Sequence, residues 1–311
     1  MPTTFAPLAA YPELAAARSA LNAGDWSAVE RFFATLTEDL DHTAAVIALV
    51  EGVPPAGQFL REVCAGSGTA LARLVLAEWL IRRGWKTRTN RRSRDVSRKQ
   101  FTAFFEYVQQ AEQLLSGVTA AEPWNTTAWT LRVITARALE LGQPESARRY
   151  AEVARVSPHH AIAQRQRIQQ LAPKWGGTVD DMHGFARHCR DTAPPGSASA
   201  LAVADAHLEH WLHLGTSPTY LRGRAVRAEL IDVAERSVLH PQYRPGLRWV
   251  QDHNTMAVAL SLAGERSAAA RHFRILGRFG SLHPWDYLFS GSPRSAFAVH
   301  RVLALTRGRN R

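Results

Sequence analysis

Histidines that could bind a metal are concentrated between residues 205 and 213. His207, His210 and His213 recur at intervals of three, and Glu209 lies between them. On a helix, His207 and His210 lie about one turn apart, a common spacing for two zinc ligands. A third ligand would have to come from elsewhere in the chain, and the candidates are His160, His183 and His188. Because no His-Glu-x-x-His motif is present, we predict ordinary histidines on a polar helix face, with no metal site and no cofactor.

Nucleophilic catalysis has little support in the sequence. No Gly-x-Ser-x-Gly motif is present. Cys189 directly follows His188, but adjacent side chains diverge on a helix, so this pair does not form a catalytic dyad. The sequence therefore leaves the catalytic residues unknown and favours a protein that is not an enzyme.

Two glycine-containing turns could in principle bind phosphate. The turn Lys174-Trp175-Gly176-Gly177 has its lysine before the glycines and follows a helical pattern, whereas a Walker loop places the lysine after the glycines and follows a strand. We therefore predict that this turn ends a helix, with Trp175 packed under it. In Gly66-Ser67-Gly68-Thr69, a flexible turn followed by a capping hydroxyl explains the residues fully.

Basic residues are concentrated in one segment. The net charge of the chain is +11, and residues 82–99 supply +8 of it, because nine arginines and lysines outweigh one aspartate. We predict a basic loop there, between helices at 68–84 and 95–116. Such a loop either remains solvated or binds nucleic acid, an acidic protein surface or acidic lipid. Its basic residues are Arg82, Arg83, Lys86, Arg88, Arg91, Arg92, Arg94, Arg98 and Lys99.

Composition limits the class of protein. Apolar residues make up 46% of the chain, which excludes wholesale disorder. The two cysteines, Cys64 and Cys189, are far apart and form no Cys-x-x-Cys motif, so we predict neither a disulfide nor a cysteine-bound zinc ion. No apolar run is long enough to span a membrane, and residues 1–10 lack the basic region of a secretory signal, so we predict a cytoplasmic protein.

Helical periodicity extends over nearly the whole chain, and three glycine-containing corners resemble one another. The corners begin at Gly24, Gly142 and Gly264, and each combines a glycine that can end a helix with small and polar residues that can start the next one. Corners of this kind are typical of the helical hairpins of tetratricopeptide-repeat (TPR) proteins, although the spacing between the three corners is irregular. We predict an all-α fold, a TPR-like right-handed α-solenoid that forms one domain over residues 1–311.

One region also carries a family resemblance. The residues Pro158-His159-His160, Pro173-Lys174-Trp175-Gly176-Gly177-Thr178 and Phe185-Ala186-Arg187 resemble the signature of a bacterial family that is common in actinobacteria. That family has TPR-like helical repeats and is catalogued as a domain of unknown function. The similarity covers about residues 120–215, and it implies a fold but no activity.

The resulting functional prediction is a non-enzymatic binding or scaffold protein. The concave face of a solenoid commonly binds a peptide or a protein partner. The alternatives are a small-molecule or enzymatic site in the middle helices and nucleic-acid association through the basic loop. Helices 159–171, 178–190 and 197–214 are predicted to stack, with Trp175, Phe185 and Trp211 in their core. The side chains predicted to bind a ligand or partner are His160, Arg165, Arg187, His207, Glu209 and His210.

Overall fold

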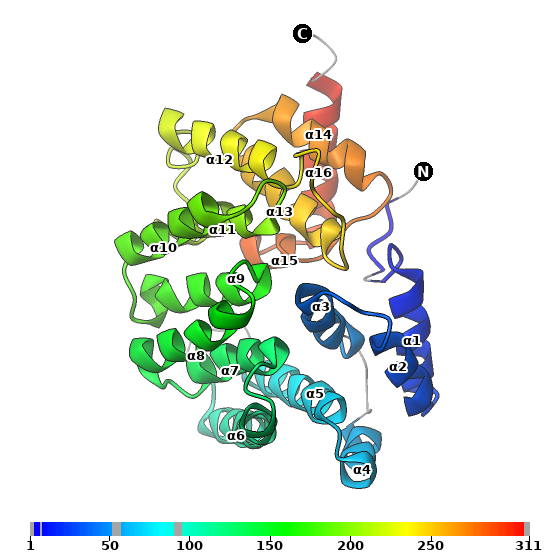
Figure 1. Ribbon diagram of the computed structural model, residues 1–311. Coiled ribbons are helices and arrows are strands. Elements are labelled where there is room, and N and C mark those ends of the chain that lie inside the picture. Colours follow the sequence, from blue (N-terminus) through cyan, green and yellow to red (C-terminus); the bar gives the residue numbers. More distant parts are fainter. Residues whose placement is uncertain (1–2, 7, 52–56, 90–94, 308–311) are drawn as a thin grey trace. The chain divides into compact units, whose positions relative to one another are not determined.

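The computed structural model describes residues 3–6, 8–51, 57–89 and 95–307, and this part of the chain is helical (Figure 1). It contains sixteen α-helices and no β-strand, and its extended backbone pairs only in an isolated bridge between Thr4 and Phe279. The predicted all-α fold is confirmed. The chain divides into an N-terminal unit, Pro12–Arg167, and a C-terminal unit, which combines Met1–Tyr11 with Ile168–Arg311. The organisation as one domain stays a prediction.

The N-terminal unit consists of helices packed on one another, and Leu60, Leu80 and Leu131 are among its fully buried residues. Its helices are α1 (Pro12–Asn22), α2 (Trp26–Phe33), α3 (Asp39–Leu49), α4 (Gly57–Ser67), α5 (Ala70–Arg88), α6 (Arg98–Ala121), α7 (Thr126–Ala138) and α8 (Gly142–Val156). The next helix, α9 (Ala161–Leu171), contains the boundary between the two units.

The C-terminal unit has an aromatic core in which Phe273, Trp285 and Phe297 are fully buried and lie within 6.3 Å of one another. Its helices are α10 (Val179–Thr192), α11 (Ala202–His213), α12 (Arg224–Arg236), α13 (Trp249–Leu262), α14 (Arg266–Leu276), α15 (Trp285–Leu288) and α16 (Pro293–Arg307). Two 3-10 turns, Pro173–Trp175 and Ala198–Leu201, precede α10 and α11.

The three predicted glycine corners are present. Gly24, Gly142 and Gly264 all have a positive φ, between 78° and 83°, a conformation that side chains other than glycine adopt only with strain. They connect the packed pairs α1 and α2, α7 and α8, and α13 and α14. The sequence therefore identified these hairpins from local chemistry alone.

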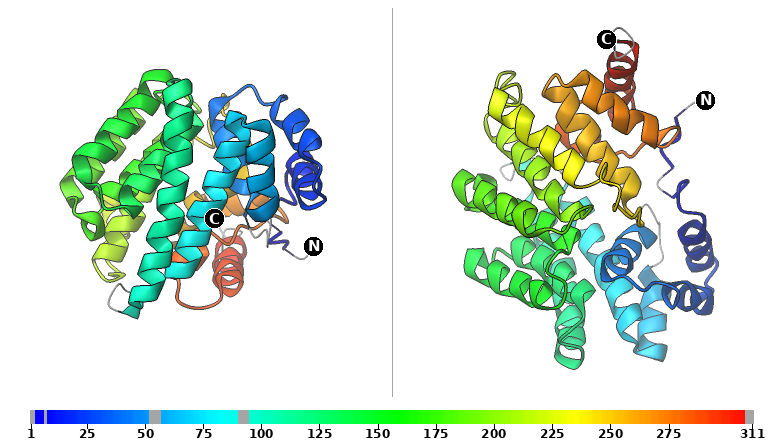
Figure 2. Two further views of the ribbon diagram at one scale, coloured as in Figure 1. Left: turned by 90° about the horizontal axis from the view of Figure 1, so that it is seen from below. Right: turned by 45° about the horizontal axis from the view of Figure 1, so that its top comes forward.

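The predicted basic loop is wrong at residues 85–88, because α5 continues to Arg88, while α6 begins at Arg98, three residues later than predicted. These two long helices lie side by side (Figures 1 and 2). Trp85 packs against Phe104 with ring centroids 4.9 Å apart, and the Arg88 guanidinium lies 5.8 Å from the Trp85 ring. These contacts stabilise the last turns of α5 by partly burying an aromatic ring in a stretch that looks polar in sequence. Arg91, Arg92 and Arg94 lie outside the described residues.

The predicted core around α10 and α11 is partly correct. These helices pack together, Trp211 is buried, and Phe185 packs against the same core. Trp175 is only partly buried on its 3-10 turn, and its predicted place in this core stays a prediction. The turn itself ends as predicted, since Gly176 is left-handed and the Thr178 hydroxyl caps α10 by accepting from the backbone N–H of Asp181.

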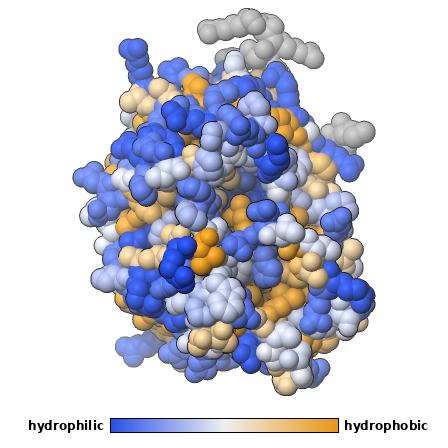
Figure 3. Space-filling model, viewed as in Figure 1, coloured by the Kyte–Doolittle hydropathy of each residue, from blue (hydrophilic) through white to orange (hydrophobic). Residues whose placement is uncertain are grey.

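Hydrophilic and hydrophobic residues are interspersed on the face shown in Figure 3. Scattered apolar side chains are ordinary on a protein surface, whereas a broad apolar patch marks a binding surface. The apolar residues of this face are therefore scattered and do not form one broad patch.

Candidate functional site: a basic pocket and a histidine cluster

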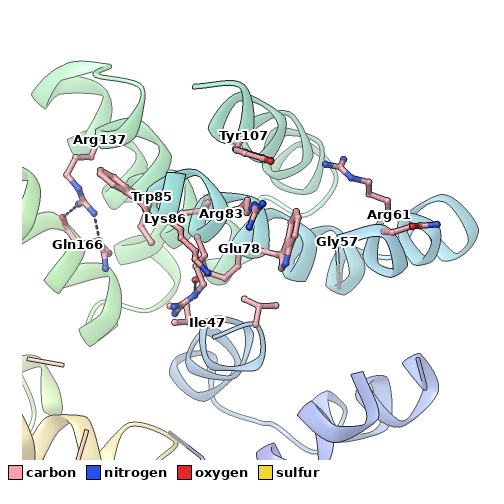
Figure 4. A pocket seen from close by; sticks show the side chains of 16 residues that line it. Ile47, Gly57, Arg61, Glu78, Arg83, Trp85, Lys86, Tyr107, Arg137 and Gln166 are labelled. Atoms are coloured by element: carbon pink, nitrogen blue, oxygen red, sulfur yellow. Dashed lines mark hydrogen bonds and ion pairs between the residues drawn. The ribbon is translucent and has the colours of Figure 1, made fainter. Parts of the chain in front are cut away.

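The N-terminal unit contains an open pocket of about 1080 Å³. Side chains from α3, α4, α5, α6, α7 and α9 line it (Figure 4). Glu78 lies between Arg137 and Gln166 at one end and Arg61 at the other (Figure 4). This volume lies just above the usual range for small-ligand sites, which is about 300–1000 Å³.

The lining of this pocket is strongly basic. It includes five cationic side chains and a single carboxyl group, that of Glu78. The cations are Arg61, Arg82, Arg83, Lys86 and Arg137. Three of them, Arg82, Arg83 and Lys86, come from the segment that the sequence marks as basic, and all three lie on α5. An anionic ligand would neutralise this group of charges.

The spacing of residues on α5 explains the position of the carboxyl group. Glu78, Arg82 and Lys86 follow one another at intervals of four residues and therefore share one face of the helix. The Arg82 Nε–H donates to Glu78 Oε1 at 2.7 Å. The Glu78 side chain is buried, and its other oxygen, Oε2, has no hydrogen-bond partner. Burial raises the pKa of Glu78 to about 7, although Arg82 acts in the opposite direction.

Aromatic side chains and fixed polar groups complete the walls. Trp79, Trp85 and Tyr107 line the pocket, and Trp79 packs so closely on α4 that a Cβ atom at Gly57 would lie 2.3 Å from its ring. Arg137 is held in place because it donates to the backbone and side-chain oxygens of Gln166, at 3.1 and 2.8 Å. The pocket therefore combines positive charge with rigid apolar surface.

A histidine cluster lies in the C-terminal unit, on α10, α11, α12 and the loop before α12. Tyr220 Oη lies 2.8 Å from His207 Nδ1 and 3.3 Å from His183 Nε2, which in turn lies 3.1 Å from His210 Nδ1. His207 Nε2 lies 3.0 Å from Glu229 Oε2. The chain of contacts thus runs from Glu229 through two imidazoles and a phenol to His210.

Charges set the protonation states in this cluster. Burial alone would raise the pKa of Glu229, but hydrogen bonds from Arg187 and His207 outweigh it and lower the pKa to about 2. An ionised Glu229 requires His207 to donate from Nε2, so its Nδ1 accepts from the Tyr220 hydroxyl. Burial raises the pKa of Tyr220, which therefore keeps its proton. Burial, together with the neighbouring His207 and His210, lowers the pKa of His183 to about 4. The histidines are neutral near pH 7, and the Tyr220 hydroxyl acts as a hydrogen-bond donor and not as a nucleophile.

The structure separates the predicted site residues into three groups. Arg187, His207 and His210 belong to the histidine cluster, where Arg187 donates to Glu229 at 2.9 Å. Glu209 lies in a second cluster of the C-terminal unit, with Lys174 Nζ at 2.6 Å and Tyr287 Oη at 2.7 Å.

His160 and Arg165 belong to the N-terminal unit. His160 is buried, with Nε2 3.1 Å from Thr43 Oγ1, and its Nδ1 accepts from the Ala163 N–H at the start of α9. That position gives His160 a capping role. Sequence reasoning missed the pocket residues Arg61, Glu78 and Arg137, although the repeat of four from Glu78 to Lys86 was a visible signal.

Among the described residues, no group of three or more histidine, cysteine, aspartate or glutamate side chains is arranged to hold a metal ion. No helix within the same ranges is both long enough and apolar enough to cross a membrane. No protein-family model matches the chain, and neither a curated protein nor a solved structure matches it. The family resemblance therefore stays a prediction.

Proposed function

We propose that this chain is a binding protein whose basic pocket takes an acidic peptide segment of a partner protein. The observation that supports the proposal is the pocket of about 1080 Å³, in which five cationic side chains and three aromatic ones surround a single carboxyl group. Glutamate and aspartate side chains on the partner would pair with the cations, and its apolar side chains would pack on the tryptophans. A peptide suits the pocket better than a compact ligand because side chains from six helices line an open space.

We also propose, as the sequence predicts, that the chain folds as a TPR-like right-handed α-solenoid, belongs to the bacterial family that it resembles, and is cytoplasmic. The three glycine corners and their packed helix pairs support the repeat architecture. In a solenoid, stacked helical pairs present side chains of several helices to one ligand, and the pocket has this character.

The histidine cluster supports an enzymatic or small-molecule function less well. The Tyr220 hydroxyl already donates to His207, and His207 is held by Glu229. A nucleophile or general base has to face a substrate, whereas this hydroxyl faces the protein. We therefore assign the cluster a structural role.

Peptide binding can be tested by calorimetry with a peptide of about twelve residues that alternates glutamate with leucine and phenylalanine, against the same peptide with lysine in place of glutamate. The double variant Arg83→Glu/Lys86→Glu reverses two charges of the pocket. We expect it to weaken binding of the acidic peptide at least about tenfold, equivalent to about 1.4 kcal/mol.

The matched control is Arg98→Glu/Lys99→Glu, which reverses two charges of the same basic segment outside the pocket lining. This control should bind the acidic peptide nearly as well as the wild type. Equal losses in both double variants would show that the segment attracts acidic ligands without using the pocket. If a single-stranded oligonucleotide bound more tightly than the peptide, with a strong dependence on salt, nucleic-acid association would replace the proposal.

A further inference from the structure

One oxygen of Glu78 distinguishes this residue from the other polar groups of the pocket. Oε1 accepts from Arg82 at 2.7 Å, while Oε2 is buried in the wall without a hydrogen-bond partner. Leaving a buried polar atom unpaired destabilises a folded protein, so such an atom beside a pocket points to a group on a ligand. The inference drawn from it rests on the proposed function, because it concerns the same pocket.

The charged groups around Glu78 come from several elements. Arg82 lies on the same helix, and Glu51, just after α3, acts on Glu78 with a like charge. Arg61 on α4, Lys86 on α5 and Arg137 on α7 line the same pocket. The cations favour an anion in the pocket, yet a carboxylate of the ligand placed at Oε2 would face a second carboxylate. When two carboxyl groups share a site, their mutual repulsion raises the pKa of one of them and favours its neutral form.

We infer that Glu78 takes part in ligand recognition in its neutral form, in which Oε2 carries a proton and donates a hydrogen bond to a carboxylate oxygen of the acidic segment. Arg82 fixes which oxygen carries the proton, because its N–H already donates to Oε1. The five cations hold the ligand carboxylates ionised, and Glu78 accepts the proton. Binding therefore takes up a proton from solution, and acidification tightens it.

The size of the effect follows from the ionisation of the free protein. With a pKa of about 7, Glu78 is mostly neutral at pH 6 and mostly ionised at pH 8. If only the neutral form binds, the affinity falls about tenfold between pH 6 and pH 8, in proportion to the neutral fraction. The carboxyl groups of the peptide stay ionised over this interval, since their ordinary pKa is about 4.

The experiment measures the affinity for the same acidic peptide at pH 6 and pH 8, for the wild type, Glu78→Gln and Glu106→Gln. Glutamine has the shape of neutral glutamic acid and keeps an N–H donor. Glu78→Gln should therefore bind equally well at both pH values and about tenfold more tightly than the wild type at pH 8. Glu106→Gln, an exposed glutamate on α6, should behave like the wild type.

Calorimetry of the wild type in buffers of different ionisation enthalpy gives a second measurement that needs no variant. It should show an uptake of about half a proton at pH 7. Binding of the peptide without proton uptake, or a Glu78→Gln protein that binds more weakly at both pH values, would overturn this inference and leave the proposed function standing. If the peptide bound neither protein at either pH, both would fail.

Discussion

Acid should destabilise the C-terminal unit strongly, and two buried histidines set the size of the effect. Burial, with help from neighbouring imidazoles, lowers the pKa of His183 to about 4, and burial lowers that of His253 to about 4. In the unfolded chain both should titrate near the ordinary value of about 6.5. The unfolded state therefore takes up protons first as the pH falls, and the folded state loses stability from about pH 6.5 down to about pH 4.

Between pH 7 and pH 5, each of these histidines should lower the free energy of unfolding by about 2 kcal/mol, so the pair should lower it by about 4 kcal/mol. Burial also lowers the pKa of His207 and His272, which adds to the effect with the same sign. Since folded proteins are stable by about 5–15 kcal/mol, this loss is a large fraction of the total.

Urea denaturation at pH 7 and pH 5 measures the loss directly. In His183→Gln, an amide can keep the contacts to His210 and Tyr220 without titrating, so the difference between the two pH values should shrink by about 2 kcal/mol. The matched control is His188→Gln, at an exposed position on the same helix, which should leave the difference nearly unchanged. An identical pH dependence in the wild type and His183→Gln would refute the assignment of the acid sensitivity to the cluster.

Two further predictions concern stability and can be checked by thermal and urea denaturation. Gly177→Ala should destabilise the chain by at least about 2 kcal/mol, because a Cβ atom there would lie 2.0 Å from the Leu171 carbonyl oxygen. Gly184→Ala, in the middle of α10 with no atom near the added methyl, should stabilise it by about 0.5–1 kcal/mol, and equal effects at the two glycines would contradict the structure. Trp285→Ala should cost about 3–5 kcal/mol, because the ring is fully buried and its indole N–H donates to Asn254 Oδ1. Trp175→Ala should cost clearly less, since that ring is partly exposed, and a loss as large as that of Trp285→Ala would show that the turn is a core element.

Sequence reasoning succeeded where the cause was local. A glycine that ends a helix and a hydroxyl or carboxylate that starts the next one act within a few residues, so the corners at Gly24, Gly142 and Gly264 and the cap at Thr178 could be located from the chain alone. It failed where the cause was a contact between helices. The packing of Trp85 on Phe104 stabilises the last turns of α5 in the basic segment, and no local pattern shows that contact.

The candidate sites, too, could be predicted from the sequence where the cause was local, and not where it was a contact between helices. The spacing of His207 and His210 put both on neighbouring turns, and the fold brings His183, one of three possible partners, to His210. Tyr220 and Glu229 complete that cluster from a loop and another helix, which the sequence does not connect to it. The pocket likewise draws cations from three helices, and only those of α5 belonged to the predicted basic patch.

The two polar sites differ in how their carboxyl groups are paired, although the cluster also leaves one buried atom, His183 Nδ1, without a hydrogen-bond partner. In the histidine cluster, the charged group Glu229 accepts hydrogen bonds from Arg187, Arg190 and His207, so its charge is compensated within the protein. In the pocket, Glu78 has one oxygen paired and the other buried without a partner, beside a group of cations. An unpaired buried oxygen costs about 1–3 kcal/mol, and replacing Glu78 by an apolar residue would remove that cost. A ligand that brings the missing partner would remove this cost at the wall of a basic pocket, and for this reason we propose the pocket, and not the cluster, as the binding site.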